Sequence, residues 1–154
     1  MAIRPATPED AERISALVES AYSRWVPRIG LRPAPMDADY RAHVDEGDVF
    51  VVVDPDVVAV LVLRPADGDA LMVENVAVDP HRQGEGLGPT LLEFAETQAR
   101  GRELRELRLY THELMTENIE LYERLGWMEY DRLVSHGFAR VFFRKPVTAL
   151  RAGD

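Results

Sequence analysis

The chain has 154 residues, of which 46% are hydrophobic and 29% charged, and its formal net charge is −9. This size and composition are ordinary for one soluble domain, while the acidic balance argues against nucleic-acid binding, which needs a basic surface. The absence of cysteine excludes disulfides, thiolate metal sites and a cysteine nucleophile.

The N-terminal third predicts a short strand followed by two helices. We expect a strand at Ala2–Arg4 and a helix from the N-cap residue Thr7 to about Trp25, because apolar residues recur there at helical spacing. Pro27–Pro35 contains repeated helix breakers and predicts a loop. A second helix is predicted at Asp37–Glu46.

The rest of the chain predicts six more strands and two more helices. Further helices are expected from Pro89 onward and at 116–125. A long helix lies between the predicted strands Leu71–Val78 and Leu107–Thr111, which implies that these two strands pair in parallel. We expect a single domain over residues 1–146 and a frayed tail at 147–154. The strands are predicted at Val49–Val53, Val57–Leu63, Leu71–Val78, Leu107–Thr111, Trp127–Val134 and Phe138–Lys145.

A glycine-rich turn follows the strand that ends at Val78. Gly84, Gly86 and Gly88 remove three side chains just before a helix, so backbone amides and the positive helix end can approach a phosphate or pyrophosphate. A dinucleotide-binding fold would need this turn early in a βαβ unit and an acidic residue on the next strand. That strand ends instead in Tyr110 and a threonine. A P-loop is excluded because no Gly-Lys-Ser/Thr follows.

Two motifs resemble those of the GNAT superfamily of acyl-CoA-dependent N-acyltransferases. Gln83, Gly86 and Gly88 stand in QGEGLG directly behind AVDP, and a late helix ends in LY before Gly126 and Trp127. The order of elements is similar to that family over nearly the whole chain. The resemblance implies an α/β (α+β) fold of the GNAT type, with a mixed, mostly antiparallel sheet of about seven strands and about four helices. Its fourth and fifth strands would be parallel and splayed, leaving a slot for acyl-CoA.

The resemblance also implies acetyl-CoA as cosubstrate; no metal is expected, because the histidines lack metal-ligand spacing. Its pyrophosphate would take backbone amides of the glycine-rich turn with Arg82 as a charge partner, and its pantetheine arm would pair with backbone at Val76 and Val78. The usual asparagine of the late helix is replaced by Met115, so Asn118 is expected either to supply that hydrogen bond or to bind local backbone. The implied cofactor-binding residues are Val76, Ala77, Val78, Arg82, Gln83, Gly84, Glu85, Gly86, Leu87, Gly88, Asn118 and Tyr122.

Tyr122 and Glu74 are the expected catalytic residues. The resemblance makes Tyr122 the acid that returns a proton to the CoA sulfur. Because the pKa of a phenol is higher than that of a thiol, this transfer costs about 2 kcal/mol. The alternative is a core tyrosine. Glu74 is expected to act as base toward the amine; alternatively it binds the amine electrostatically or neutralises a nearby arginine.

The expected acceptor-binding residues lie mainly in the segment from Trp25 to Met36. Arg28 and Arg32 could clamp a carboxylate of the acceptor, whereas the large apolar side chains there could equally cover the core. His112 could relay protons, and the four histidines show no metal-ligand spacing. The expected substrate-binding residues are Trp25, Arg28, Arg32, Tyr40, Glu74 and Thr111.

These features predict a cytoplasmic N-acetyltransferase that moves an acetyl group from acetyl-CoA to a small primary amine by direct attack. The amine could be an amino acid or a similar carboxylate-bearing molecule. The alternatives are a catalytically weak module that binds CoA or a peptide, and an enzyme that acetylates proteins or peptides. We expect no nucleic acid and no membrane as partner. Phe138, Phe142 and Phe143 could line a homodimer contact or pack in the core.

Overall fold

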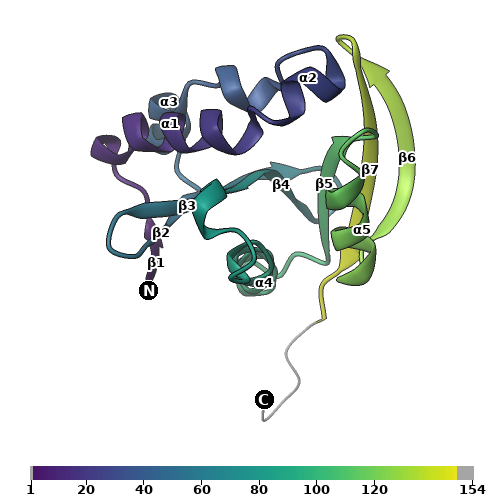
Figure 1. Ribbon diagram of the computed structural model, residues 1–154. Coiled ribbons are helices and arrows are strands. Elements are labelled where there is room, and N and C mark those ends of the chain that lie inside the picture. The colour runs from purple at the N-terminus through teal and green to yellow at the C-terminus, as the bar shows by residue number, and fades with distance from the viewer. Residues whose placement is uncertain (1, 149–154) are drawn as a thin grey trace. The chain divides into compact units, whose positions relative to one another are not determined.

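The structure is a computed structural model that describes residues 2–148. Within that range the chain forms seven strands and five α-helices (Figure 1). The strands are β1 (Ala2–Pro5), β2 (Val49–Val53), β3 (Val57–Ala66), β4 (Ala70–Val78), β5 (Glu106–His112), β6 (Met128–Ser135) and β7 (Phe138–Pro146). The helices are α1 (Ala11–Tyr22), α2 (Trp25–Ile29), α3 (Tyr40–Glu46), α4 (Leu87–Gly101) and α5 (Thr116–Arg124). Short 3-10 turns lie at η1 (Pro8–Asp10), η2 (Ala34–Asp37) and η3 (Pro80–Arg82).

The strands follow the order β1-β2-β3-β4-β5-β7-β6 in one mixed sheet. β4 and β5 are parallel, whereas the β1–β2, β2–β3, β5–β7 and β6–β7 pairs are antiparallel. This confirms the predicted fold class. The described part of the chain has one α-helix more than the four or so expected, and that helix is α2.

The chain divides into two compact units. Unit 1 comprises Met1–Leu63 and Asn75–Leu92, and unit 2 comprises Arg64–Glu74 and Glu93–Asp154. The end of β4 and the start of α4 therefore belong to unit 1, and the remainder of both elements belongs to unit 2. That residues 1–146 form a single domain stays a prediction.

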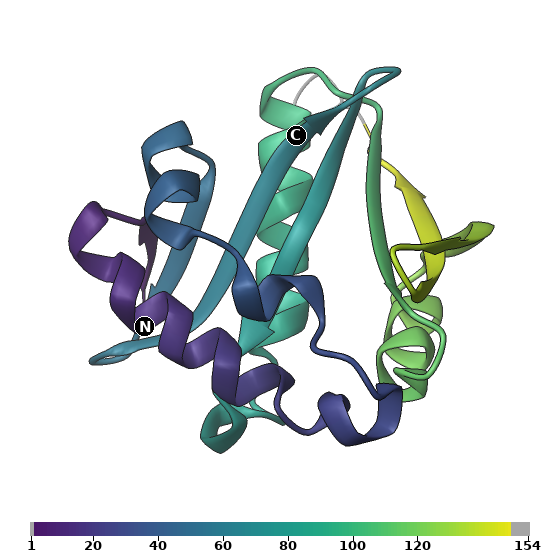
Figure 2. The ribbon, with the colours of Figure 1, turned by 90° about the horizontal axis from the view of Figure 1, so that it is seen from above.

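Unit 1 has its core between a pair of helices and the first strands. Figure 1 shows α1 and α3 on one side of β1–β3, and in Figure 2 the purple helix α1 crosses over these strands. The helical stripe of Ile14, Leu17 and Val18 is buried against Val51 and Val60 of the strands. The apolar spacing that predicted α1 is thus the spacing that builds this core.

The predicted loop over Pro27–Pro35 is wrong in part, because Trp25–Ile29 is helical. Pro27 is the third residue of α2, where a backbone N–H would have no intrahelical acceptor in any case, so proline removes nothing there. Gly30 ends the helix with a φ of +84° and donates its N–H to Val26 O at 2.8 Å. α1 also ends earlier than expected, at Tyr22.

Unit 2 contains a sheet with two different faces. On the face toward α5, Leu107 and Leu109 of β5 are buried, as is Phe143 of β7, whose ring contacts Tyr122 of α5. The other face carries half-buried and charged side chains. The hairpin turn between β6 and β7 has positive φ at His136 and at the glycine that follows, as a two-residue turn requires.

Two of the three hairpin phenylalanines lie outside the fully buried core. Phe143 is fully buried, whereas Phe138 and Phe142 are half-buried and make ring contacts within unit 2. A homodimer contact therefore stays a prediction. Of the expected tail, Val147 donates its N–H to Arg105 O at 2.8 Å, and residues 149–154 lie outside the described residues. Of the helices between residues 2 and 148, none has the length and the apolar composition that crossing a membrane requires.

Candidate active site

The glycine-rich turn of unit 1 runs from η3 into α4, and its three glycines have two different reasons for being there. Gly84 and Gly86 have φ values of +85° and +84°, a conformation that side chains disfavour. Gly88 has an ordinary helical φ, and a Cβ added to it would meet nothing within 4 Å. Within residues 2–148, neither backbone conformation nor packing requires glycine at position 88, and the bare position leaves the turn open to the close approach of a ligand.

The backbone N–H groups of this turn have no acceptor in the part of the chain that the structure describes. Leu87 is buried and anchors the start of α4, where Thr90 donates its N–H to Gly86 O at 3.1 Å. The first N–H groups of a helix have no intrahelical acceptor. Within residues 2–148, no hydrogen bond takes the amides of residues 83–88. These exposed donors and the positive end of a 15-residue helix can hold an anion.

Arg82 braces the turn instead of standing open beside it. Its guanidinium lies 2.8 Å from Asp54 Oδ2 and 2.9 Å from Glu85 Oε2, and it donates to Asp54 O at 3.0 Å. These two carboxylates, Glu85 first, raise the pKa of Arg82 further above its usual value. Arg82 therefore connects the β2–β3 turn to the glycine-rich turn, and its direct contact with a pyrophosphate stays a prediction.

The end of β4 alternates between two environments. Asn75 and Ala77 are buried, and Ala77 belongs to the core with α1 and α3, while Val76 and Val78 are half-buried. Asn75 Oδ1 accepts from Tyr22 Oη at 2.7 Å, and Asn75 Nδ2 donates to Tyr40 Oη at 2.9 Å. The contact of pantetheine with the backbone of Val76 and Val78 is untested.

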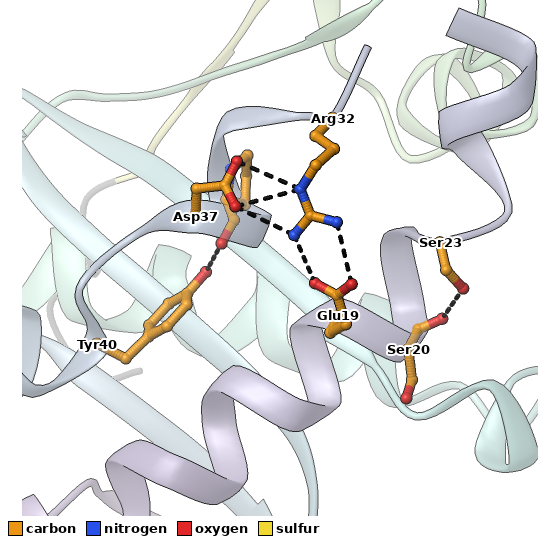
Figure 3. A network of polar contacts seen from close by, with 7 residues as sticks. Glu19, Ser20, Ser23, Arg32, Asp37 and Tyr40 are labelled. Carbon is orange, nitrogen blue, oxygen red and sulfur yellow. Dashed lines mark hydrogen bonds and ion pairs between the residues drawn. The ribbon is translucent and has the colours of Figure 1, made fainter. Parts of the chain in front are cut away.

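This hydrogen-bonded chain continues into η2, since Tyr40 donates to Pro35 O at 2.6 Å (Figure 3). Tyr40 is thus buried and engaged with Asn75 and Pro35, and its role in binding an acceptor stays a prediction. Sequence reasoning missed Asn75. The signal that could have found it is an amide at a position that the alternation along β4 places on the same face as the buried Val73 and Ala77, since a buried amide requires partners.

The two arginines expected to clamp an acceptor carboxylate differ in their surroundings. Arg32 lies 2.8 Å from Glu19 and 3.1 Å from Asp37, so its donors already face two carboxylates (Figure 3). The guanidinium of Arg28 lies 4.8 Å from the centre of the Trp25 ring. Trp25 itself is 3% exposed, which agrees with the packing alternative. Contact of these residues with an acceptor is untested.

Glu74 is the last residue of β4 in unit 2. The parallel register of β4 and β5 runs to Val73↔Leu109, so Glu74 and Tyr110 each follow directly after the last pair. The Glu74 carboxylate is half-buried and lies 3.5 Å from Arg64. The predicted alternative in which Glu74 neutralises an arginine is therefore present in the structure, without excluding the other two roles.

Tyr110 is surrounded by charge. Burial, and next the Glu74 carboxylate, raise the pKa of Tyr110, while Arg140 and Arg64 oppose that shift. The Arg140 guanidinium stacks 4.6 Å from the centre of the Tyr110 ring. We call Glu74, Arg64, Tyr110 and Arg140 the Tyr110 cluster. Sequence reasoning singled out only Glu74 of these four, although the alternation along β5 and β7 could have placed Tyr110 and Arg140 on one face.

Tyr122 lies on the opposite face of the unit 2 sheet from the Tyr110 cluster. It is 7% exposed and packs against the rings of Trp127 at 6.1 Å and Phe143 at 5.8 Å. Burial raises the pKa of Tyr122 to about 12. The phenol therefore keeps its proton at neutral pH, as a proton donor must.

Met115 connects the two other expected site residues near Tyr122. Its sulfur accepts from Thr111 Oγ1 at 3.3 Å and lies 3.6 Å from Asn118 Nδ2. Thr111 is buried and faces the same side of β5 as the core leucines, so the structure does not place it with Glu74. Contact of Thr111 with an acceptor and of Asn118 with CoA stays a prediction.

His112 has a structural partner at the end of β5. Its Nδ1 accepts from the backbone N–H of Leu114 at 3.1 Å, which requires the unprotonated form of that nitrogen. Burial lowers the pKa of His112, so the ring is neutral at neutral pH. A neutral ring held by the chain agrees with a turn-stabilising residue.

Comparisons with known proteins agree with this geometry. A curated relative, the mycothiol acetyltransferase of Streptosporangium roseum, is 43% identical over 56 residues, which are 36% of this chain but only 17% of the relative. The chain thus spans about a sixth of the length of that relative.

Solved structures match over nearly the full length. A crystal structure from Desulfovibrio desulfuricans, described as a GNAT-family acetyltransferase, has a TM-score of 0.76 at 24% identity and covers 96% of this chain and 99% of its own. The PaiA N-acetyltransferase of Thermoplasma acidophilum, solved with coenzyme A, has a TM-score of 0.72 at 16% identity, covering 94% and 98%. Both likenesses show the fold. A sequence model of the acetyltransferase (GNAT) family matches residues 14–127, and the chain therefore belongs to this family.

Proposed function

We propose that this protein transfers an acetyl group from acetyl-CoA to a primary amine of a small molecule by direct attack. Family membership supports acetyl transfer in general. The single observation that carries the cosubstrate assignment is that the backbone amides of residues 83–88 have no acceptor within residues 2–148. Gly88 lies in the first turn of α4, beside these amides, so a bare backbone at this position leaves room for a ligand to reach them.

Acetyl-CoA supplies an activated acetyl group and an anionic diphosphate. The residues of the turn fit the diphosphate, because the amides of residues 83–88 have no other acceptor in the described chain and the side chains at 84, 86 and 88 are absent. Backbone at Val76 and Val78 is proposed to pair with the pantetheine arm as an added strand would. Arg82 holds the turn in shape through Asp54 and Glu85.

Tyr122 is proposed to return a proton to the departing sulfur. Its pKa of about 12 stands about 3.5 units above an ordinary thiol, which corresponds to about 5 kcal/mol. The low-polarity surroundings that raise the pKa of the phenol would raise that of a thiol beside it too, which narrows this gap. Burial therefore guarantees the protonated form without making the transfer prohibitive.

Glu74 is proposed to receive the acceptor amine. An alkylammonium ion must lose a proton before it can attack, and near neutral pH this deprotonation costs about 4 to 5 kcal/mol. A half-buried carboxylate at the end of the paired part of β4 can bind the ammonium ion and accept that proton, directly or through water. Arg64, whose guanidinium lies 3.5 Å from the Glu74 carboxylate, fixes the position of that carboxylate.

The test combines binding and turnover. Titration calorimetry with acetyl-CoA and measurement of released thiol over a panel of free amines and short peptides, followed by mass spectrometry of the products, separate the three candidate functions. Thiol release with acetylated small amines supports the proposal. Binding without thiol release would indicate a module that only binds CoA, acetylation of peptides alone would indicate a protein acetyltransferase, and no binding of acetyl-CoA would refute the assignment.

A further inference from the structure

Arg140 has no carboxylate partner among the described residues of this acidic chain. The sequence has 27 acidic and 18 basic residues, and in unit 2 Arg64, Arg108 and Arg132 each lie within 3.5 Å of a carboxylate. Within residues 2–148, no carboxylate pairs with Arg140. Its guanidinium is held by aromatic rings instead, 4.6 Å from the centre of Tyr110 and 5.9 Å from that of Phe138.

Stacking on rings leaves the edge of a guanidinium available. The flat face of the group contacts the aromatic ring, whereas its five N–H donors point outward in the plane and match the two oxygens of a carboxylate. The rings also restrict the rotamers of Arg140, so less freedom is lost when those donors bind an anion. The arrangement therefore resembles a fixed anion receptor more than a solvated surface charge.

Arg140 and Glu74 flank Tyr110 on one face of the sheet. Tyr110 pairs with Phe142 across β5 and β7, and Arg140 is two residues from Phe142, hence on the same face. Glu74 follows the pair Val73↔Leu109 on the strand at the other side of β5, and its charge acts on Tyr110 together with that of Arg140. Where the strands are paired, the backbones of β4 and β7 are two strand spacings apart, about 10 Å; Glu74 lies one residue beyond the last β4–β5 pair, and Arg140 is opposite His112.

The two charges have opposite sign, and an aromatic ring lies between them. A carboxylate at one side can bind an ammonium group, a guanidinium at the other can bind a carboxylate, and the ring can contact the carbon skeleton that joins them. An amine without an anionic group would leave the donors of Arg140 without a partner.

We propose that Arg140 binds a carboxylate of the acceptor while Glu74 receives its amine, so that the enzyme selects amino acids over simple amines. This rests on the proposed function and adds the substrate class. It places the acceptor carboxylate at a different arginine from the expected Arg28 and Arg32, of which Arg32 already faces Glu19 and Asp37.

The test measures kcat and KM for matched pairs of acceptors, each an amino acid and its decarboxylated amine. L-Phenylalanine with phenethylamine and L-leucine with isoamylamine are two such pairs. We expect the unmodified enzyme to prefer the amino acid by tenfold or more in kcat/KM, as a charge-assisted contact supplies. Arg140→Gln should abolish that preference, because KM should rise at least tenfold more for the amino acid than for the simple amine.

The matched control is Arg144→Gln. Arg144 lies on the same face of β7 and its guanidinium stacks 5.8 Å from the centre of the Tyr130 ring, but it does not belong to the Tyr110 cluster, so its replacement should leave the preference intact. Arg140→Lys keeps the charge without the planar fork and should retain part of the preference; it also carries the test if the glutamine variant unfolds.

The outcomes separate this proposal from the function beneath it. If the enzyme acetylates simple amines as well as amino acids, and the Arg140 variants do not change the ratio of the two kcat/KM values, the assignment of Arg140 is overturned and the acetyltransferase proposal stands. Absence of turnover with every amine would overturn both. An equal loss of preference in the Arg144 variant would show that the effect is general positive charge and would also overturn the assignment.

Discussion

Replacing Gly88 by glutamine should make the ligand-free protein more stable and acetyl-CoA binding weaker. Gly88 has helical backbone, and a Cβ added there meets no atom within 4 Å, so the backbone can accept the substitution. Glutamine has a better helix propensity than glycine by about 0.5 kcal/mol, which for a protein of this size raises Tm by about 1 to 2 °C. The side chain would at the same time occupy the space above the amides of the turn, and we expect the Kd for acetyl-CoA to rise tenfold or more.

Gly101→Gln provides the matched control for this opposite response. Gly101 closes the same helix, also without positive φ and with open space at its Cβ, but it lies at the other end of α4. Calorimetric unfolding and acetyl-CoA titration of the two variants should show a similar small change in Tm and a loss of affinity in Gly88→Gln alone. Unchanged affinity in Gly88→Gln would refute the reasoning that the bare position is reserved for the cosubstrate.

Three further predictions concern other parts of the molecule. Tyr122→Phe should lower kcat by a factor of about 100 or more while the Kd for acetyl-CoA stays within twofold; equal losses of kcat and affinity in this variant would argue against a role as acid. Because the pKa of Tyr122 is about 12, the unmodified enzyme should lose no activity through deprotonation of Tyr122 below about pH 10. Asn75→Leu removes the amide that donates to Tyr40 Oη and should lower the free energy of unfolding by about 1 to 3 kcal/mol in denaturant titrations. An unchanged midpoint of unfolding would show that water replaces the amide. Arg4 lowers the pKa of Asp10 to about 2. The ion pair therefore stabilises the fold above the pKa of Asp10 in the unfolded chain, near 4, and this stabilisation is lost as the pH falls toward 2. Acid titration should show the free energy of unfolding fall by about 1 kcal/mol in this range, a value reduced for the exposure of Arg4, and Asp10→Asn should remove this pH dependence.

The parts of the fold that depend on local conformation could be read from the sequence. The glycine-rich turn is an example, because Gly84 and Gly86 adopt a backbone conformation that the residue type itself indicates. The strand bounds of β2 were predicted to the residue from a β-branched run between turn residues. The helix at Trp25–Ile29 was missed, because a proline in the first turn of a helix looks the same in sequence as one that breaks a helix.

The polar contacts of the candidate site depend on partners that are remote in sequence. Asn75 bonds to Tyr22 and Tyr40, which lie 53 and 35 positions away. Arg32 looked available for an acceptor until its carboxylate partners were located. Charge and residue type predict what a side chain can bind, but only the fold decides which group reaches it first.

The bracing of the glycine-rich turn bears on the thermodynamics of ligand capture. Because Leu87 is buried and Arg82 is fastened to Asp54 and Glu85, the receptor is already ordered before any anion arrives. Little backbone entropy remains to be lost on association. Binding of a diphosphate to this segment should consequently be rapid and close to rigid-body docking. Hydrogen exchange of the backbone amides of the turn should slow because the phosphates cover them, and not because the turn changes its conformation.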